Sequence, residues 1–434
     1  MQDTLSQKSE NTCVICPNVA DAKKDMSESS RLAEIVGLAY AIDLDVVHSE
    51  VIKLKSIKPS TYFSKGFIEK FKPFFVENQI TLMIVDALLS PIQQRNLEKE
   101  LDVKVIDRTA LILEIFGERA NTNEGKLQVE LAHLTYQRSR LVRSWTHLER
   151  QRGGAGFLGG PGEKQIELDR RIIDEKIIKI KKELEKVKNT RHLQRGNRRK
   201  VPYPIAAIVG YTNAGKSTLF NMLSGASVLA KDMLFATLDP TLRKIKLPSG
   251  NEVIFSDTVG FISDLPHELI MAFRSTLEEV LEADVVIHVR DISNDDTSLQ
   301  RKDVLSVLEN IGLKNIENMP NYIEVLNKVD LLSEEDKSIL ENKIANQSKE
   351  IIPMSALTGQ GCKELCLSID KILSAGYKQY AIEVDPSDGK LQSWLYSNAV
   401  VLQKDTIDDK LIFNIKVNEA NSQRLVKLFD INLD

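Results

Sequence analysis

The chain has 434 residues, 42% of them hydrophobic and 28% charged, and a formal net charge of −4. This length allows two to four domains with buried cores, and the near-neutral charge excludes a general attraction to nucleic acid or anionic membranes. No apolar run is long enough to cross a bilayer, and the polar N-terminus has no signal-peptide core, so we expect a cytoplasmic protein.

Residues 1–30 are polar and mixed in charge, and we expect them to form a disordered tail. Within this tail, Cys13 and Cys16 form an isolated C-x-x-C. No further Cys or His pair at zinc spacing accompanies it, so we expect two solvated thiols. Cys362 and Cys366 lie four residues apart in a helical pattern and are expected to pack.

Residues 31–120 alternate strand-like and helix-like runs, which predicts a small N-terminal α/β domain. The strand-like runs cover residues 33–44, 81–86 and 103–106, and the helix-like runs cover 66–77 and 90–101.

Residues 121–200 predict an antiparallel two-helix arm. Apolar residues recur at spacings of three and four on both sides of a glycine-rich loop, with Arg138 as the one polar interruption. The two runs are Leu127, Leu131, Leu134, Leu141, Trp145 and Leu148, then Ile173, Ile177, Ile180, Leu184 and Val187.

The loop at 153–162 would form the tip of this arm, with Phe157 and Leu158 exposed. Five arginines lie near its base, and a basic stretch at 191–200 ends the arm; the arginines are Arg138, Arg140, Arg143, Arg150 and Arg152. Such a tip could enter an RNA cavity and contact unstacked bases. A connector with a solvated basic face fits the same residues.

Residues 203–375 alternate strand and helix regularly, which predicts a doubly wound, mostly parallel sheet. The expected strands are 205–209, 253–256, 285–289, 322–326 and 351–354. Residues 376–434 read as β–α–β–β–α, a small α+β C-terminal domain.

A phosphate-binding P-loop stands at the start of this third region. The sequence from Gly210 to Ser217 reads G-x-x-x-x-G-K-S, between an apolar strand and a helix-compatible run. The glycines let backbone N–H groups turn toward phosphate oxygens, Lys216 can reach the β- and γ-phosphates, and the Ser217 hydroxyl can hold Mg²⁺.

Three further motifs follow at the carboxyl ends of expected strands. Asp257-Thr-Val-Gly260 can bind Mg²⁺ through water and present the Gly260 N–H to the γ-phosphate. Asn327-Lys-Val-Asp330 suits guanine, because the Asp330 carboxylate accepts from N1–H and N2–H₂, whereas adenine offers an acceptor at N1. Ser355-Ala-Leu357 can offer a backbone N–H to guanine O6. The four motifs together predict a GTP-binding G domain.

Three features concern hydrolysis. Thr237 or Thr241 could complete the Mg²⁺ shell, and Thr237 is preferred. The position after D-x-x-G, where Ras-like proteins place a water-orienting Gln, is Phe261, so hydrolysis should be slow unaided. Asn213 is a candidate ligand for K⁺ between the phosphates; a simple turn-forming role is the alternative.

The assembled pattern resembles the HflX family of translation-associated GTPases. In the G domain the likeness rests on GYTNAGKSTLFN (210–221), FATLDPTLR (235–243), DTVGFI (257–262), DLPHELIMAF (264–273), NKVD and SAL. Outside it, the likeness rests on DRTALILEIF (107–116), EGKLQVELAHL (124–134) and the segments around the glycine-rich loop (145–171). The resemblance implies GTP hydrolysis with Mg²⁺, Thr237 as a metal ligand, and binding to the large ribosomal subunit near its peptidyl transferase region, to split or rescue stalled ribosomes under stress.

We therefore expect a monomeric GTPase that docks on ribosomal RNA through the 121–200 arm. The expected catalytic residues are Lys216, Thr237, Gly260 and Asn213, and the metal ligands are Ser217 and Thr237. The expected nucleotide contacts are Gly210, Tyr211, Thr212, Asn213, Ala214, Gly215, Lys216, Ser217, Phe235, Ala236, Thr237, Leu238, Asp239, Asp257, Thr258, Val259, Gly260, Asn327, Lys328, Val329, Asp330, Ser355, Ala356 and Leu357. The alternatives are a ribosome-assembly or RNA-modifying GTPase, and an RNA-binding scaffold with a weakly active G domain.

Overall fold

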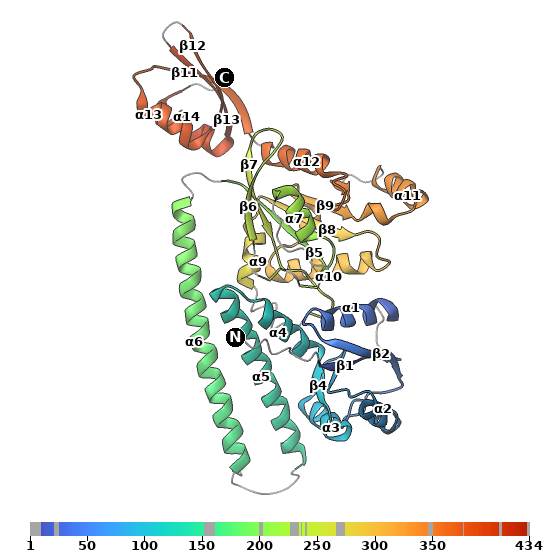
Figure 1. Cartoon of the computed structure of the whole chain (residues 1–434). Coiled ribbons are helices and arrows are strands. Elements are labelled where there is room, and N and C mark those ends of the chain that lie inside the picture. Colours follow the sequence, from blue (N-terminus) through green and yellow to red (C-terminus); the bar gives the residue numbers. More distant parts are fainter. Residues whose placement is uncertain are drawn as a thin grey trace, which may run out of the picture.

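The structure is a computed structural model that describes residues 10–20, 26–151, 161–198, 203–225, 234–235, 237–238, 241–265, 274–345, 350–375, 377–407 and 410–431. It contains an N-terminal α/β domain, a two-helix arm, a G domain and a C-terminal α+β domain (Figure 1). This is the mixed α/β architecture that the sequence predicts. Within the described ranges, no helix combines the length and apolarity needed to cross a membrane.

The N-terminal domain has a four-stranded parallel sheet in the order β2-β1-β3-β4. Its elements are β1 (Asn11–Val19), α1 (Glu28–Tyr40), β2 (Asp45–Leu54), α2 (Lys65–Glu77), β3 (Leu82–Val85), α3 (Pro91–Leu101), β4 (Lys104–Asp107) and α4 (Arg108–Arg119). Helices α1 and α4 pack on one face of the sheet and α2 and α3 on the other. The start of α3 shows why a helix begins there: Ser90 and Gln93 form a capping box, with Pro91 as the first helical residue.

Two expectations for this domain are wrong. Residues 11–19 are not part of a disordered tail but form β1, an inner strand between β2 and β3. Cys13 and Cys16 are therefore buried rather than solvated, and burial raises the pKa of each thiol to about 12. Most of the run at 33–44 is not a strand but the helix α1, because Ser27 caps it and its buried residues recur at helical spacing.

The arm consists of α5 (Asn123–Gln151) and α6 (Pro161–Arg198), which lie side by side and run in opposite directions (Figure 1). Its seam contains seven of the eleven apolar residues expected from the sequence: Leu127, Leu131, Leu134, Ile173, Ile177, Ile180 and Leu184. Leu141 and Val187 are not part of this cluster, and the side chains of Trp145 and Leu148 lie outside the described part of the chain. Arg138, the polar interruption of that pattern, pairs with Asp174 of α6 through Nε and Oδ1 at 2.8 Å. The interruption is thus a cross-helix ion pair.

The G domain has a six-stranded sheet in the order β10-β9-β8-β5-β7-β6, parallel except for β6. Its elements are β5 (Ile205–Gly210), α7 (Lys216–Ser224), β6 (Thr241–Lys246), β7 (Glu252–Asp257), α9 (Arg274–Leu281), β8 (Val285–Asp291), α10 (Thr297–Ile311), η1 (Ile316–Asn318), β9 (Tyr322–Asn327), η2 (Val329–Leu331), α11 (Glu334–Ala345), β10 (Ile351–Pro353) and α12 (Cys362–Ser374). Helices α9 and α10 cover one face, and α7 and α12 cover the other. All five expected strands are present, and β6 is an antiparallel edge strand that the sequence did not indicate.

The C-terminal domain follows the expected order β11 (Tyr377–Val384), α13 (Gly389–Asn398), β12 (Val400–Ile407), β13 (Lys410–Asn418) and α14 (Glu419–Phe429). Its antiparallel sheet has the order β11-β13-β12. The hydrophobic cluster of this domain is built from residues between 380 and 431 only.

Candidate functional site

The P-loop connects the end of β5 to the start of α7. Lys216 is buried, and its Nζ donates a hydrogen bond to the backbone oxygen of Tyr211 at 2.7 Å. Burial lowers the pKa of Lys216 to about 8, although the Asp257 carboxylate opposes the shift. The loop thus encloses a cation at the N-terminus of a helix, where an anion binds favourably.

Two glycines allow the close approaches that this site needs. Gly215 has a φ of 92°, and a Cβ there would lie 2.1 Å from Nδ2 of Asn327. A Cβ on Gly260 would lie 2.8 Å from Cγ2 of Thr212 and 3.0 Å from Nζ of Lys216. Gly260, the last residue of D-x-x-G, therefore lies directly beside the P-loop lysine.

Three oxygen-bearing side chains converge next to this lysine. Ser217 Oγ lies 2.8 Å from Asp257 Oδ2 and 3.0 Å from Thr237 Oγ1, and Thr237 Oγ1 lies 2.9 Å from the same Oδ2. The other carboxylate oxygen, Oδ1, is buried without a hydrogen-bond partner among the described residues. Desolvation by burial raises the pKa of Asp257, while Lys216 and the two hydroxyls oppose this.

This oxygen cluster fits Mg²⁺, which prefers oxygen ligands and usually binds proteins through few side chains together with phosphates and water. The described residues contain no group of three or more His, Cys, Asp or Glu that could hold a metal. Thr241 instead begins β6 opposite Asp257, and its hydroxyl has no partner within the described ranges.

The two motifs expected to contact the base lie together at the ends of β9 and β10. Asn327 Nδ2 donates to the backbone oxygen of Ala214 at 2.8 Å, and its Oδ1 accepts from the Ala356 N–H at 2.9 Å. Asn327 therefore ties the P-loop to the 355–357 loop. Lys328 Nζ pairs with Asp291 at 2.7 Å, and Asp330 is exposed on η2.

The remaining expected contacts divide into buried and exposed groups. Thr258 is buried, and its hydroxyl donates to the backbone oxygen of Ile208 at 2.7 Å. Asn213 is exposed, with a φ of 58°, and Leu357 is also exposed. The other buried residues of this set include Thr212, Ala214, Phe235, Leu238, Val259, Val329, Ser355 and Ala356.

Several expected residues fall outside the described part of the chain. These are Ala236 and Asp239, the loop at 152–160 with Arg152, Phe157 and Leu158, and the side chains of Arg143, Trp145, Leu148, Arg150 and 191–200.

Sequence reasoning missed what the side chain of Tyr211 contacts. Its hydroxyl donates to Glu34 Oε2 of α1 and accepts from the Ser263 N–H at 2.7 Å. The ring is therefore directed toward the N-terminal domain. The backbone oxygen of Tyr211 accepts a hydrogen bond from Lys216 Nζ. No local pattern indicates this, because Glu34 and Tyr211 are 177 residues apart.

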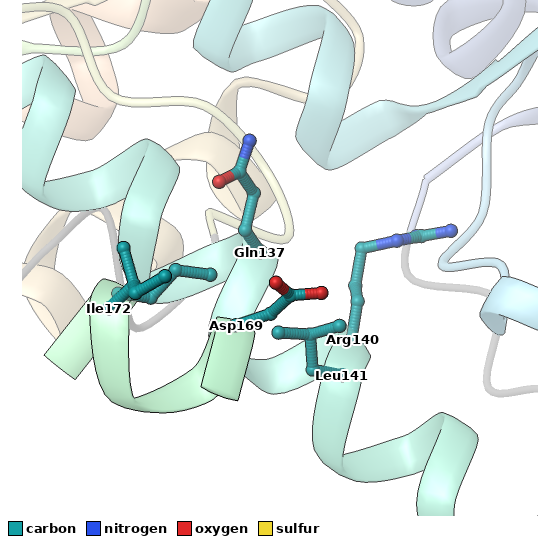
Figure 2. A pocket seen from close by; sticks show the side chains of 6 residues that line it. Gln137, Arg140, Leu141, Asp169 and Ile172 are labelled. Atoms are coloured by element: carbon teal, nitrogen blue, oxygen red, sulfur yellow. The ribbon is translucent and has the colours of Figure 1, made fainter. Parts of the chain in front are cut away.

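A separate hollow of about 420 Å³ lies between α5 and α6, lined by Gln137, Arg140, Leu141, Asp169, Ile172 and Ile173 (Figure 2). Arg140 lines it through its stem. Its guanidinium extends away and bonds the Leu89 backbone oxygen at 3.2 Å and the Tyr136 hydroxyl at 2.8 Å. The hollow belongs to the arm and not to the P-loop site.

Four family models match this chain. Residues 29–117 match the family described as GTP-binding GTPase N-terminal, 119–198 the GTP-binding GTPase middle region, 205–328 the 50S ribosome-binding GTPase, and 340–429 the HflX C-terminal domain. The chain is 48% identical over 372 residues to GTPase HflX of Magnetococcus marinus, covering 86% of this chain and 84% of that one. It is 40% identical over 373 residues to GTPase HflX of Escherichia coli, covering 86% and 85%. A crystal structure of a GTP-binding protein from Sulfolobus solfataricus in complex with GDP is 24% identical, with a TM-score of 0.45, covering 84% of this chain and 99% of that one.

Proposed function

Because this chain belongs to the HflX family of GTPases, we propose that it couples GTP hydrolysis to docking on the large ribosomal subunit, and so splits or rescues stalled ribosomes. The GTPase activity follows from the family. The ribosomal role and the assignment of individual residues are the proposal. One observation carries the residue assignment: the oxygens of Ser217, Thr237 and Asp257 meet within 3.0 Å of one another beside Lys216.

At the phosphate end, Lys216 neutralises the β- and γ-phosphate charge, and Gly260 presents its N–H to the γ-phosphate. Ser217 and Thr237 would hold Mg²⁺, and the neighbouring Asp257 carboxylate would supply negative charge to it. When bound, the ion neutralises phosphate charge. The orphaned Oδ1 of Asp257 supports this assignment, since a buried carboxylate oxygen needs a partner such as a metal-bound water.

At the base end, Asp330 reads guanine while Asn327 holds the two surrounding loops together. The hydrogen bonds of Asn327 with Ala214 and Ala356 support these two roles, because both the amide nitrogen and the amide oxygen of Asn327 are bonded to backbone groups. The exposed Asp330 carboxylate is then the group left to accept from the guanine N1–H and N2–H₂.

The residue directly after D-x-x-G cannot activate water. This residue, Phe261, is buried and apolar, and its backbone oxygen already accepts from the Thr212 N–H at 2.7 Å. Turnover should therefore depend on an activator. The large subunit is the proposed one, and K⁺ bound by Asn213 the second.

The arm is the proposed contact with ribosomal RNA. Helix α6 has 38 residues and so is about 57 Å long at the usual helical rise. Together with α5 it forms a stiff lever whose far end is distant from the nucleotide site, as Figure 1 shows. A lever of this length could push into a ribosomal cavity while its base stays attached to the N-terminal domain.

Sedimentation tests the ribosomal role. Intact ribosomes are mixed with the protein and GTP, or a non-hydrolysable GTP analogue, and separated on a sucrose gradient. We expect 70S particles to convert to subunits, with the protein in the large-subunit fraction. If intact ribosomes remain whole and only immature subunits bind the protein, the assembly alternative is correct. A variant lacking residues 152–160 should bind GTP normally but fail to split ribosomes.

A further inference from the structure

A buried ion cluster of the N-terminal domain lies directly against the loop that follows D-x-x-G. Arg108, the first residue of α4, pairs with Glu34 of α1 through Nη2 and with Asp86 through Nη1 at 2.8 Å. The Arg108 and Glu34 side chains are only 5% and 7% exposed, and Asp86 is fully buried. Arg31 completes the cluster through Nε, 2.5 Å from Asp86.

The G domain supplies partners to the same cluster through Ser263, three residues after Gly260. Arg108 donates to the Ser263 backbone oxygen at 2.9 Å and to its hydroxyl at 3.1 Å. That hydroxyl donates to Glu34 Oε1 at 2.9 Å, and the Ser263 N–H donates to the Tyr211 hydroxyl at 2.7 Å. Every polar group of Ser263 is thus engaged.

Tyr211 joins the P-loop to the same cluster, because its hydroxyl donates to the other carboxylate oxygen of Glu34. One carboxylate therefore holds both the P-loop, through Tyr211, and the D-x-x-G loop, through Ser263. A second ion pair, Arg31 with Asp264 at 3.6 Å, joins the same two domains.

Apolar contacts support these polar ones. Phe116 of α4 meets Phe235 edge to face, with ring centroids 4.7 Å apart, and a Cβ on Gly37 of α1 would lie 3.1 Å from Leu234. Leu238, Phe261 and Ile262 belong to the same buried cluster as residues of α1 and α4. Residues that flank Thr237 and residues that follow D-x-x-G thus contact the N-terminal domain or share a buried cluster with it.

Removing a partner from a buried ion pair is costly, because it leaves a charge at low exposure with less compensation. Interaction with Glu34 and Asp86 raises the pKa of Arg108, and Arg108 and Arg31 lower the pKa of Asp86, so these charges are mutually held. Withdrawal of Ser263 and Tyr211 would leave Glu34 and Arg108 paired with each other but would remove the hydrogen bonds that both form with the G domain. These contacts therefore favour the observed position of the loop that follows Gly260.

We propose that Glu34 and Arg108 of the N-terminal domain are positioning residues for GTP hydrolysis. Acting through Tyr211 and Ser263, they hold Gly260 beside Lys216, so that the γ-phosphate meets both groups without rearrangement. GDP has no γ-phosphate and gains little from this arrangement. The inference depends on GTP hydrolysis alone, and it stands or falls independently of any ribosomal role.

The test uses the full chain with Tyr211→Phe and Ser263→Ala, which remove single hydroxyls. Affinities for GDP and for a non-hydrolysable GTP analogue are measured together with kcat and KM for GTP. We expect affinity for the GTP analogue to fall by about tenfold and kcat to fall, with GDP affinity changed by less than about twofold. Glu34→Gln, which keeps the shape, should lie between wild type and Glu34→Ala.

Tyr136→Phe is the matched control. Tyr136 also donates its hydroxyl to a buried carboxylate of this domain, Asp107 at 2.9 Å, but on the side that faces the arm. The Tyr136→Phe variant should leave the ratio of GTP to GDP affinity unchanged. The inference is overturned if Tyr211→Phe keeps the wild-type ratio, if it weakens GTP and GDP equally, or if Tyr136→Phe has the same effect. A rise in the ratio would also overturn it, since the contact would then oppose GTP binding.

Discussion

The N-terminal and C-terminal domains both flank the G domain but are attached to it in different ways (Figure 1). The N-terminal domain shares one buried cluster with the G domain, including Phe235, Leu238, Phe261 and Ile262 beside the nucleotide loops. The C-terminal domain has a cluster made only of its own residues. The N-terminal domain thus shares buried contacts with the loops of the expected nucleotide site, and we expect it to respond to nucleotide. The C-terminal cluster includes no residue of the G domain, so we expect no such response there.

The arm is joined to the same part of the N-terminal domain that contacts the G domain. The α4 helix carries Arg108 on the side of the G domain, and the residue before it, Asp107, accepts from Tyr136 of α5 at 2.9 Å. One junction thus contacts both the D-x-x-G loop and the base of the lever. The C-terminal domain has no described contact of this kind.

The largest effect should come from a matched pair of core substitutions. Phe116→Ala and Phe413→Ala each remove a fully buried ring and should each cost about 3–5 kcal/mol in the free energy of unfolding of their own domain. Only Phe116→Ala should also slow GTP hydrolysis, because its ring packs on Phe235. Denaturant unfolding and phosphate release measure the two quantities. Equal loss of GTP hydrolysis in both variants would contradict the claim that only the N-terminal domain affects the nucleotide site.

Nucleotide binding should distinguish the domains directly. Ligand stabilises whatever is coupled to its site, so GTP should protect amides of α1 and α4 from hydrogen exchange and leave β11–β13 unchanged. Lys216→Ala should reduce GTP affinity by about 100-fold and abolish this protection. Protection of all three domains alike would mean that the C-terminal domain is coupled as well.

Asp330→Asn should change which base is preferred without changing how the N-terminal domain responds to bound nucleotide. Asp330 is exposed on η2, away from the shared cluster. We expect GTP affinity to fall by about tenfold or more and affinity for xanthosine triphosphate to rise, since the amide can donate where the carboxylate could not. Xanthosine triphosphate should then protect α1 and α4 as GTP does in the wild type. Unchanged GTP affinity would contradict the assignment of guanine recognition to Asp330.

The smallest effect concerns pH. The pKa of Lys216 is about 8 in the folded chain against its ordinary 10.5, so the neutral amine is favoured above pH 8. Because the unfolded chain then binds more protons, unliganded protein gains stability as pH rises from about 8 to 10.5. Phosphate needs the charged amine, so GTP affinity should fall about twofold between pH 7 and 8 and more steeply above. Calorimetry in buffers of different ionisation enthalpy should detect proton uptake on binding, and its absence at pH 8.5 would contradict this.

The sequence revealed what is local and periodic. The P-loop, the five parallel strands of the G domain and the arm seam depend on short motifs or on spacings of three and four, and each is present. Arg138, the one polar position in this pattern, is accommodated by an ion pair with Asp174 of the other helix.

What the sequence did not reveal depends on distant partners. Strand β1 contains Cys, Asn and Pro and resembles a tail until β2 and β3 pair with it. Strand β6, TLRKIK, is a mostly exposed edge strand with little apolar pattern. The contacts of Tyr211 and Ser263 with Glu34 span 177 and 229 residues, and no pattern within a window of residues can indicate them.

The measurement that tests the account most directly is phosphate release from GTP by the full chain, with and without large ribosomal subunits, in K⁺ and in Na⁺. The account predicts slow turnover alone, stimulation of at least about tenfold by the large subunit, and loss of that stimulation when residues 152–160 are removed. Turnover that is equally fast with and without the subunit would contradict it.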